Sequence, residues 1–146
     1  MSKIFVYIGY FLLFINCLIC LKSFSKNGKA FRIFTYYSLT MFAIQMAAHF
    51  MSSHKMNNLF LSHFYFIIQF ILLSLFYIKI LNDKFQKKVI SINMFLCTAL
   101  LFIHYALDWS RFYRFNTFET FIMSLPLIVY ATFHLYNMLK QKKEYY

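Results

Sequence analysis

The pattern of hydrophobic and polar positions divides the chain into five long apolar stretches separated by short polar connectors. The stretches run over Ile4–Leu21, Ile33–Met51, Phe60–Ile78, Val89–Leu107 and Thr120–Leu139. The charged residues, 15 Lys or Arg and 4 Asp or Glu, all lie outside them. Each stretch is close to the roughly 20 residues that an α-helix needs to cross a hydrocarbon layer. The pattern therefore predicts an all-α, polytopic integral membrane bundle of about five transmembrane helices, with residues 1–146 forming a single transmembrane domain.

Composition agrees with this prediction. The chain is 62% hydrophobic and only 13% charged, so a water-soluble bundle would have no polar face to turn toward solvent. The first stretch is not expected to be a cleaved signal peptide, because Leu21-Lys22-Ser23-Phe24 lacks a small-residue cleavage pattern. The connectors are too short to fold by themselves, and we therefore expect consecutive helices to pack as antiparallel neighbours.

The distribution of basic residues predicts the orientation. One side of the predicted bundle carries eleven Lys or Arg, namely Lys22, Lys26, Lys29, Arg32, Lys79, Lys84, Lys87, Lys88, Lys140, Lys142 and Lys143. The other side carries four, namely Lys3, Lys55, Arg111 and Arg114. Since cytoplasmic loops retain Lys and Arg, we expect the amino terminus outside and the carboxyl terminus inside a cytoplasmic (inner) membrane. The net charge of +11 then reflects topology and attraction to anionic lipid, and we expect no nucleic-acid binding.

Small residues and proline suggest how the helices pack. Ala43-x-x-x-Ala47 in the second stretch permits close helix packing, either inside the bundle or between two copies. Pro126 in the fifth stretch leaves the carbonyl of Ile122 without its helical donor and predicts a kink, either a hinge or a static bend. Cys17, Cys20 and Cys97 are interpreted as small packing residues.

Polar side chains inside the apolar stretches are the candidates for function, because such groups face the interior of a membrane bundle. Ser38, Gln45 and His49 share one helical face, and Asn58, Ser62, Tyr65 and Gln69 share another on the next stretch. The short connector between the two stretches predicts that these faces meet, through hydrogen bonds between helices or around a ligand. The candidate polar pocket comprises Gln45, His49, His63, Gln69, His104 and Asp108.

Histidines gather at the predicted outer side, where four of the five lie: His49, His54, His63 and His104. Asp108 follows His104 by four residues and is expected to orient its ring, while Glu119 opens the fifth stretch at the same level. Three chemical hypotheses stay open beside simple placement of histidine at the interface. A transition metal would use His49, His54 and His104 with nearby Met sulfurs, a haem would use His49 and His104, and a proton sensor would use Asp108 and Glu119 as partners. We expect no resident cofactor.

Catalytic motifs are absent from the sequence. It contains no H-E-x-x-H, no G-x-S-x-G, no P-loop and no glycine-rich dinucleotide turn. We therefore expect that the protein is not an enzyme.

One segment resembles a known kind of protein. Asn57-Asn58-Leu59-Phe60-Leu61-Ser62-His63-Phe64-Tyr65, followed by Gln69-Phe70, is similar to a recurrent feature of uncharacterised small multi-pass bacterial membrane proteins, in which such a helical block serves as a sensory module. The resemblance covers mainly the second and third stretches and implies no substrate or catalytic residue. Because no kinase or regulator domain is present in the sequence, signal output is expected to pass through another protein.

These observations favour a sensory or accessory subunit of the membrane with an outward-facing polar and histidine pocket. The expected partners are the lipid bilayer and either a membrane or cytoplasmic protein or further copies of the chain. The alternative is a homo-oligomeric pore or small-solute transporter subunit. Ionisable groups at mid-membrane depth, which ion-coupled transport usually needs, are limited here to histidines.

Overall fold

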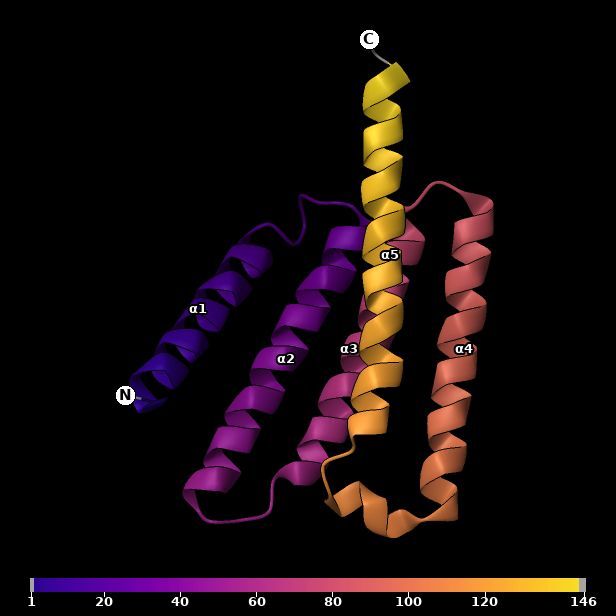
Figure 1. Cartoon of the computed structure of the whole chain (residues 1–146). Helices are drawn as coiled ribbons and strands as arrows, with labels where there is room; N and C mark the ends of the chain where they lie inside the picture. The colour runs from indigo at the N-terminus through magenta and orange to yellow at the C-terminus, as the bar shows by residue number, and fades with distance from the viewer. Residues whose placement is uncertain (1, 145–146) are drawn as a thin grey trace.

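Five long helices and one short 3-10 helix follow one another in alternating directions (Figure 1). The computed structural model describes residues 2–144, and the side chains of residues 2, 3, 110, 111 and 142–144 lie outside the description. The elements are α1 (Ser2–Lys22), α2 (Lys29–Ser53), α3 (Leu59–Ile80), α4 (Lys84–Leu107), η1 (Trp109–Tyr113) and α5 (Thr117–Glu144). Each of the five apolar stretches lies within one helix, so the all-α prediction is confirmed.

Helix ends coincide with residues that satisfy free backbone groups. The carboxylate of Asp83 accepts hydrogen bonds from the backbone N–H groups of Phe85 (2.7 Å) and Gln86 (3.1 Å), which starts α4. At the end of α2 the chain reverses through Lys55, whose φ of 57° lies in the left-handed region.

Four of the helices are long and apolar enough to cross a membrane: Ile4–Lys22, Leu59–Ile80, Lys84–Leu107 and Thr117–Gln141. The remaining long helix, α2, has 25 residues and carries polar side chains along its length, among them the buried Thr35 and Ser38. The structure therefore supports a membrane protein built as a helical bundle, in which α2 is the long helix without such an apolar span among the described residues.

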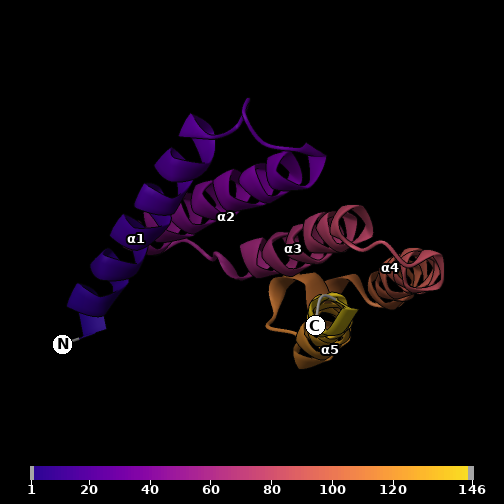
Figure 2. The ribbon, with the colours of Figure 1, turned by 90° about the horizontal axis from the view of Figure 1, so that it is seen from above.

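Helices α1, α2 and α3 lie in a row, and α3 also belongs to a cluster with α4 and α5. Viewed from above, α1, α2 and α3 follow one another, and α3, α4 and α5 surround a common centre (Figure 2). Among the described elements, α1 packs against α2 alone, whereas α3 contacts α2, α4, α5 and η1. The third helix is thus the central element of the bundle.

The main core lies between α3, α4 and α5. Its buried residues are Phe70, Leu81, Ile90, Cys97, Leu101, Tyr105, Met123 and Tyr130. Two of its polar contacts join α4 to α5 and α4 to itself: Asn93 Nδ2 donates to the Tyr130 hydroxyl (2.8 Å), and Cys97 Sγ donates to Asn93 Oδ1 (3.3 Å). Such pairing removes the cost of placing an amide or hydroxyl away from water.

A smaller polar contact holds α1 on α2. Asn16 Nδ2 donates to Ser38 Oγ (3.1 Å), and Cys17 Sγ lies 3.4 Å from the backbone oxygen of Ser38. Cys17 and Cys20 are both buried free thiols, in agreement with their interpretation as packing residues.

The structure also places the residues that suggested packing and bending. Ala43 and Ala47 are exposed, so this pair does not serve close packing between the described helices; a contact between two copies of the chain stays a prediction. The fifth helix continues as one helix through Pro126, whose side chain is buried. Whether α5 bends at this point as a hinge stays a prediction.

Truncating the core should cost far more than truncating the lipid-facing surface. Phe70 is 0% exposed and Phe95 is 73% exposed. Phe70→Ala should lower the free energy of unfolding by about 3 kcal/mol, because the cavity left behind lacks partner atoms. The matched control Phe95→Ala should change it by well under half as much. Unfolding in mixed detergent micelles measures both, and equal losses would contradict the position of the core.

Candidate functional site

A buried histidine, carboxylate and tyrosine meet where α3 begins, α4 ends and α5 begins. His63 is 0% exposed, Glu119 is 1% exposed and Tyr105 is 7% exposed. The imidazole Nδ1 of His63 contacts Glu119 Oε2 directly. The Tyr105 hydroxyl donates to the same carboxylate oxygen at 2.7 Å and lies 2.9 Å from His63 Nδ1. We name His63, Tyr105 and Glu119 the buried triad.

Helix spacing explains why these side chains face one another. Tyr105 follows Leu101 and Cys97 at intervals of four residues, and all three are buried on the same face of α4. His63 likewise lies seven residues before the fully buried Phe70. The register of the apolar core therefore carries the polar residues into the same interior.

Asn116 fixes the carboxylate end of the triad. Its Oδ1 accepts hydrogen bonds from the backbone N–H groups of Phe118 (3.1 Å) and Glu119 (3.4 Å), which caps the start of α5. Its Nδ2 donates to His104 Nε2 (3.0 Å) and lies 3.4 Å from the Tyr105 hydroxyl. The side chain of Asn116 thus both caps α5 and contacts the Tyr105 hydroxyl of the triad.

Two atoms of the triad lack hydrogen-bond partners among the described residues. They are His63 Nε2 and Glu119 Oε1, and both are buried. Each can bind a proton or accept a hydrogen bond. Most buried polar atoms in proteins are paired. Gln69 Oε1 and Ser74 Oγ on α3 are also buried without partners among the described residues, so what distinguishes the triad is that both of its unpaired atoms belong to ionisable side chains.

Aromatic rings of η1 cover the triad. The ring of Phe112 stacks on His63 with centroids 5.1 Å apart, and the ring of Trp109 stacks on Phe112 at 5.3 Å. Tyr105, Trp109 and Phe112 also line an almost entirely apolar cavity of about 300 Å³ between α3, α4 and α5. A stack of two rings, Phe112 and Trp109, therefore links His63 to η1, and the apolar cavity lies beside this stack.

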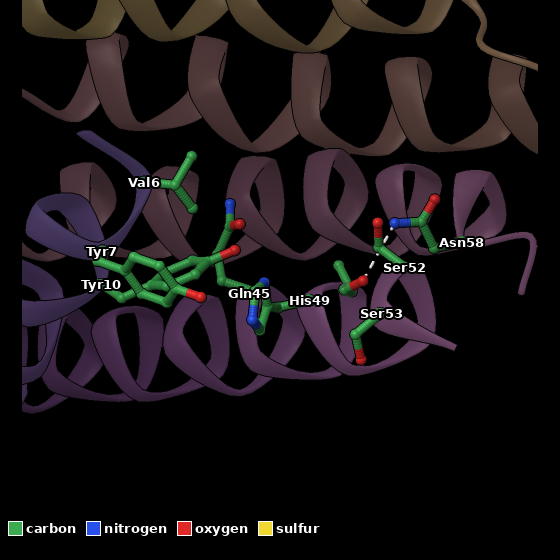
Figure 3. A pocket seen from close by; sticks show the side chains of 9 residues that line it. Val6, Tyr7, Tyr10, Gln45, His49, Ser52, Ser53 and Asn58 are labelled. Atoms are coloured by element: carbon green, nitrogen blue, oxygen red, sulfur yellow. Dashed lines mark hydrogen bonds between the residues drawn. The ribbon is translucent and has the colours of Figure 1, made fainter. Parts of the chain in front are cut away.

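A second polar region lies between α1 and α2. This pocket, which we name the α1–α2 pocket, has a volume of about 670 Å³. Its lining comprises Val6, Tyr7, Tyr10, Gln45, Ala48, His49, Ser52, Ser53 and Asn58 (Figure 3). The rings of Tyr7 and Tyr10 approach His49 edge-on, at centroid distances of 6.0 and 5.3 Å.

One wall of the α1–α2 pocket is fixed by the chain reversal after α2. Asn58 Nδ2 donates to the backbone oxygen of Ala48 (3.1 Å), as the dashed line in Figure 3 marks. Gln45 and Asn58 also line a neighbouring pocket of about 300 Å³ between α2 and α3, together with Ser62 and Tyr65. Of the polar face predicted on the second stretch, Gln45 thus lies beside polar residues of the third stretch, whereas Ser38 and His49 contact α1.

The structure divides the six residues of the candidate polar pocket between separate places. Gln45 and His49 line the α1–α2 pocket, whereas His63 turns to the opposite side of α3 and joins the triad. Gln69 is half-buried, and its Oε1 has no hydrogen-bond partner among the described residues. His104 bonds Asn116, and Asp108 is the C-cap of α4.

The three histidines suggested as metal ligands lie in different surroundings. His49 contacts the rings of α1, His104 contacts Asn116 and Phe118, and His54 is exposed with Nδ1 2.9 Å from the backbone oxygen of Phe50. Within the part of the chain that the structure describes, no group of three or more His, Cys, Asp or Glu residues is placed to hold a metal ion.

Sequence reasoning missed Tyr105 and Asn116. Tyr105 was not among the candidate residues, but its hydroxyl lies inside the triad. The four-residue spacing from Leu101 was the signal that indicated an inward direction. Asn is a preferred residue type at the N-cap of a helix, so the sequence could have indicated that Asn116 caps the helix that begins at Thr117. Nothing in the sequence indicated its second contact, with His104.

No family model, curated protein or solved structure matches this chain. The interpretation of the two polar regions consequently depends on their geometry.

Removing the acceptor of the triad should destabilise the bundle. Glu119→Leu leaves the Tyr105 hydroxyl and the His63 N–H without their shared acceptor, and a buried unpaired group costs about 1–3 kcal/mol. Glu119→Gln keeps a carbonyl oxygen and should cost less. Thermal unfolding in detergent compares the two variants. Equal melting temperatures for Glu119→Leu and the wild type would contradict the triad as a stabilising contact.

Proposed function

We propose that all five long helices cross the membrane. The four apolar helices include α1 and α3, which run in the same direction (Figure 1). If both cross, the chain that joins the end of α1 to the start of α3 has to return across the bilayer, and α2 is the helix between those points. Its polar side chains are accommodated because they face α1 and α3.

We propose further that the end with the α2–α3 connector and η1 faces outward. Support comes from the basic residues, since the connectors at the opposite end hold most of the Lys and Arg. The α1–α2 pocket and the buried triad then lie toward the outer side of a cytoplasmic membrane.

Single-cysteine labelling tests this topology. Lys26 and Lys55 are both exposed, in the connectors at opposite ends of α2, while Cys17, Cys20 and Cys97 are buried. A membrane-impermeant maleimide added to intact cells should label Lys55→Cys, and should label Lys26→Cys only after the membrane is permeabilised. Labelling of both from the same side would contradict a crossing by α2.

Within this topology the protein is a sensory or accessory subunit of the membrane that receives a ligand or partner at the α1–α2 pocket. The observation that carries this proposal is the pocket itself, which combines about 670 Å³ of space with hydroxyl, amide and imidazole groups. Those groups offer hydrogen bonds in a setting where lipid offers none.

The attachment of α1 supports a receptive role. Since α1 packs only against α2 among the described elements, a molecule that enters between them changes one helix contact and leaves the α3–α4–α5 core intact. The buried residues of the core are mainly apolar, and the cavity beside them is lined almost entirely by apolar groups, which favours a subunit over a polar pore through a single chain.

Site-specific crosslinking from native membranes tests the receptive role. A photoreactive residue in place of Tyr10, in the pocket wall, should capture a stoichiometric partner that mass spectrometry identifies. The same residue at Phe95, which is exposed on α4, should not. Gln45→Ala with His49→Ala should abolish capture, whereas His54→Ala, outside the pocket lining, should preserve it.

The opposite result has a defined meaning. Crosslinks only between copies of this chain, together with solute flux through liposomes that contain the purified protein, would contradict the accessory role and establish the homo-oligomeric pore.

A further inference from the structure

The described residues that line the α1–α2 pocket include no Lys, Arg, Asp or Glu, although the chain carries 15 Lys or Arg and 4 Asp or Glu. The neighbouring pocket of about 300 Å³ between α2 and α3 likewise has none of these residues in its described lining. A phosphate, carboxylate or ammonium group would find no opposite charge at either place, and an unpaired charge away from water is costly. The occupant that fits both linings is therefore uncharged.

Several polar groups of the α1–α2 pocket are available to bond an occupant. Ser53 Oγ already donates to the backbone oxygen of Phe50 (2.7 Å), and Asn58 Nδ2 donates to that of Ala48 (3.1 Å), the dashed line in Figure 3. Hydrocarbon cannot satisfy the remaining groups, so the pocket requires an occupant that forms hydrogen bonds. The side chains without a hydrogen bond among the described residues are the amide of Gln45 and the hydroxyls of Tyr7, Tyr10 and Ser52.

These groups narrow the chemistry of the occupant. Hydroxyls and amides both donate and accept hydrogen bonds, so the occupant has to do the same in several directions. The backbone of a partner helix cannot, because its N–H and C=O groups are bonded within that helix. A sugar can, since each of its hydroxyls donates and accepts, and its C–H faces are apolar enough to rest on aromatic rings. Tyr7 and Tyr10 provide such rings beside His49, at centroid distances of 6.0 and 5.3 Å.

The α1–α2 pocket continues into a more apolar one. Its volume of about 670 Å³ lies within the range of small-molecule sites, about 300–1,000 Å³. Gln45, Ala48 and Asn58 line both this pocket and the one between α2 and α3. The second pocket adds the apolar side chains of Ile44, Leu59, Leu61, Phe66 and Phe115. The joined surfaces therefore suit a sugar alone in the first pocket, or a sugar whose apolar chain extends into the second.

We propose that the α1–α2 pocket binds an uncharged, hydroxyl-rich group, namely a sugar. Gln45, His49 and Tyr10 bond its hydroxyls, and the tyrosine rings of α1 contact its C–H faces. This proposal rests on the proposed receptive role of the pocket and names the chemistry of what the pocket receives. In the proposed topology the sugar reaches it from the outer side, either dissolved in water or as the headgroup of a lipid.

Lipid retention in native mass spectrometry tests this chemistry. The purified full chain, in a detergent without sugar groups, is titrated with three lipids that have identical dioleoyl chains: monoglucosyl diacylglycerol, phosphatidylglycerol and phosphatidylcholine. The glucosyl lipid should be retained saturably. The two phosphate-bearing lipids should need concentrations at least about tenfold higher, because their charges have no partner in the pocket.

Variants of the pocket connect retention to its polar groups. Gln45→Ala with His49→Ala should weaken retention of the glucosyl lipid about tenfold, because at least two hydrogen bonds are lost. Tyr10→Phe removes one hydroxyl, keeps the ring and should weaken retention about fivefold. The matched control Ser53→Ala should leave it unchanged, because that hydroxyl is bonded to Phe50. Circular dichroism and the melting temperature show whether each variant is folded.

Competition distinguishes the two sources of the sugar. Methyl glucoside carries the sugar alone, and octyl glucoside carries the same sugar on an apolar chain. Displacement of the glucosyl lipid by both at similar concentrations would assign the pocket to a dissolved sugar. Displacement by octyl glucoside at far lower concentration would assign it to a lipid headgroup. Octyl phosphocholine, with the same chain and a charged headgroup, should displace nothing.

Retention of phosphatidylglycerol more tightly than the glucosyl lipid would overturn the proposal, as would glucosyl retention that survives both Tyr10→Phe and the Gln45 and His49 substitutions. A third contrary result separates this proposal from the receptive role. If no glucosyl compound binds while a photoreactive residue at Tyr10 still captures a stoichiometric protein, the sugar chemistry is wrong and the receptive role stands. Loss of both binding and capture would contradict both proposals.

Discussion

Hydrocarbon offers no hydrogen bonds, and this constraint accounts for the polar contacts that join the helices of the bundle. The amide of Asn16 meets Ser38, the amide of Asn93 meets Tyr130, and the carboxylate of Glu119 meets His63 and Tyr105. Each contact joins two different helices, so the polar groups that would be costly alone become the points at which helices are aligned. Apolar packing around Phe70 then fills the space between them.

The two polar regions differ in what they can do, because they differ in enclosure. The α1–α2 pocket lies beside a helix with one neighbour and has room for a molecule. The buried triad lies between three helices and is covered by the ring of Phe112. The bundle thus keeps an open polar pocket apart from an enclosed polar cluster, with α3 between them.

The sequence was sufficient for the helices and insufficient for their contacts. Apolar runs of nearly constant length predicted the positions of all five helices, because hydrophobic length is a local property. The contact between His63 and Glu119 joins residues 56 positions apart and depends on how three helices are rotated. The sequence placed His63 with Gln45 and His49, yet a rotation that buries Phe70 in the core turns His63 away from α2. Tyr105 was missed for the same reason, since a tyrosine near a helix end suits either an interface or an interior.

The polar character of α2 has a consequence for biogenesis. A segment enters the bilayer from the translocon according to its own hydrophobicity, and α2 is less apolar than the helices before and after it. Its Ser38 is bonded to Asn16 of α1, and its Ala48 carbonyl is bonded to Asn58 at the start of α3. In the proposed topology, stable insertion of α2 requires that its neighbours emerge from the ribosome and flank it, which would make α1, α2 and α3 a single unit of membrane assembly.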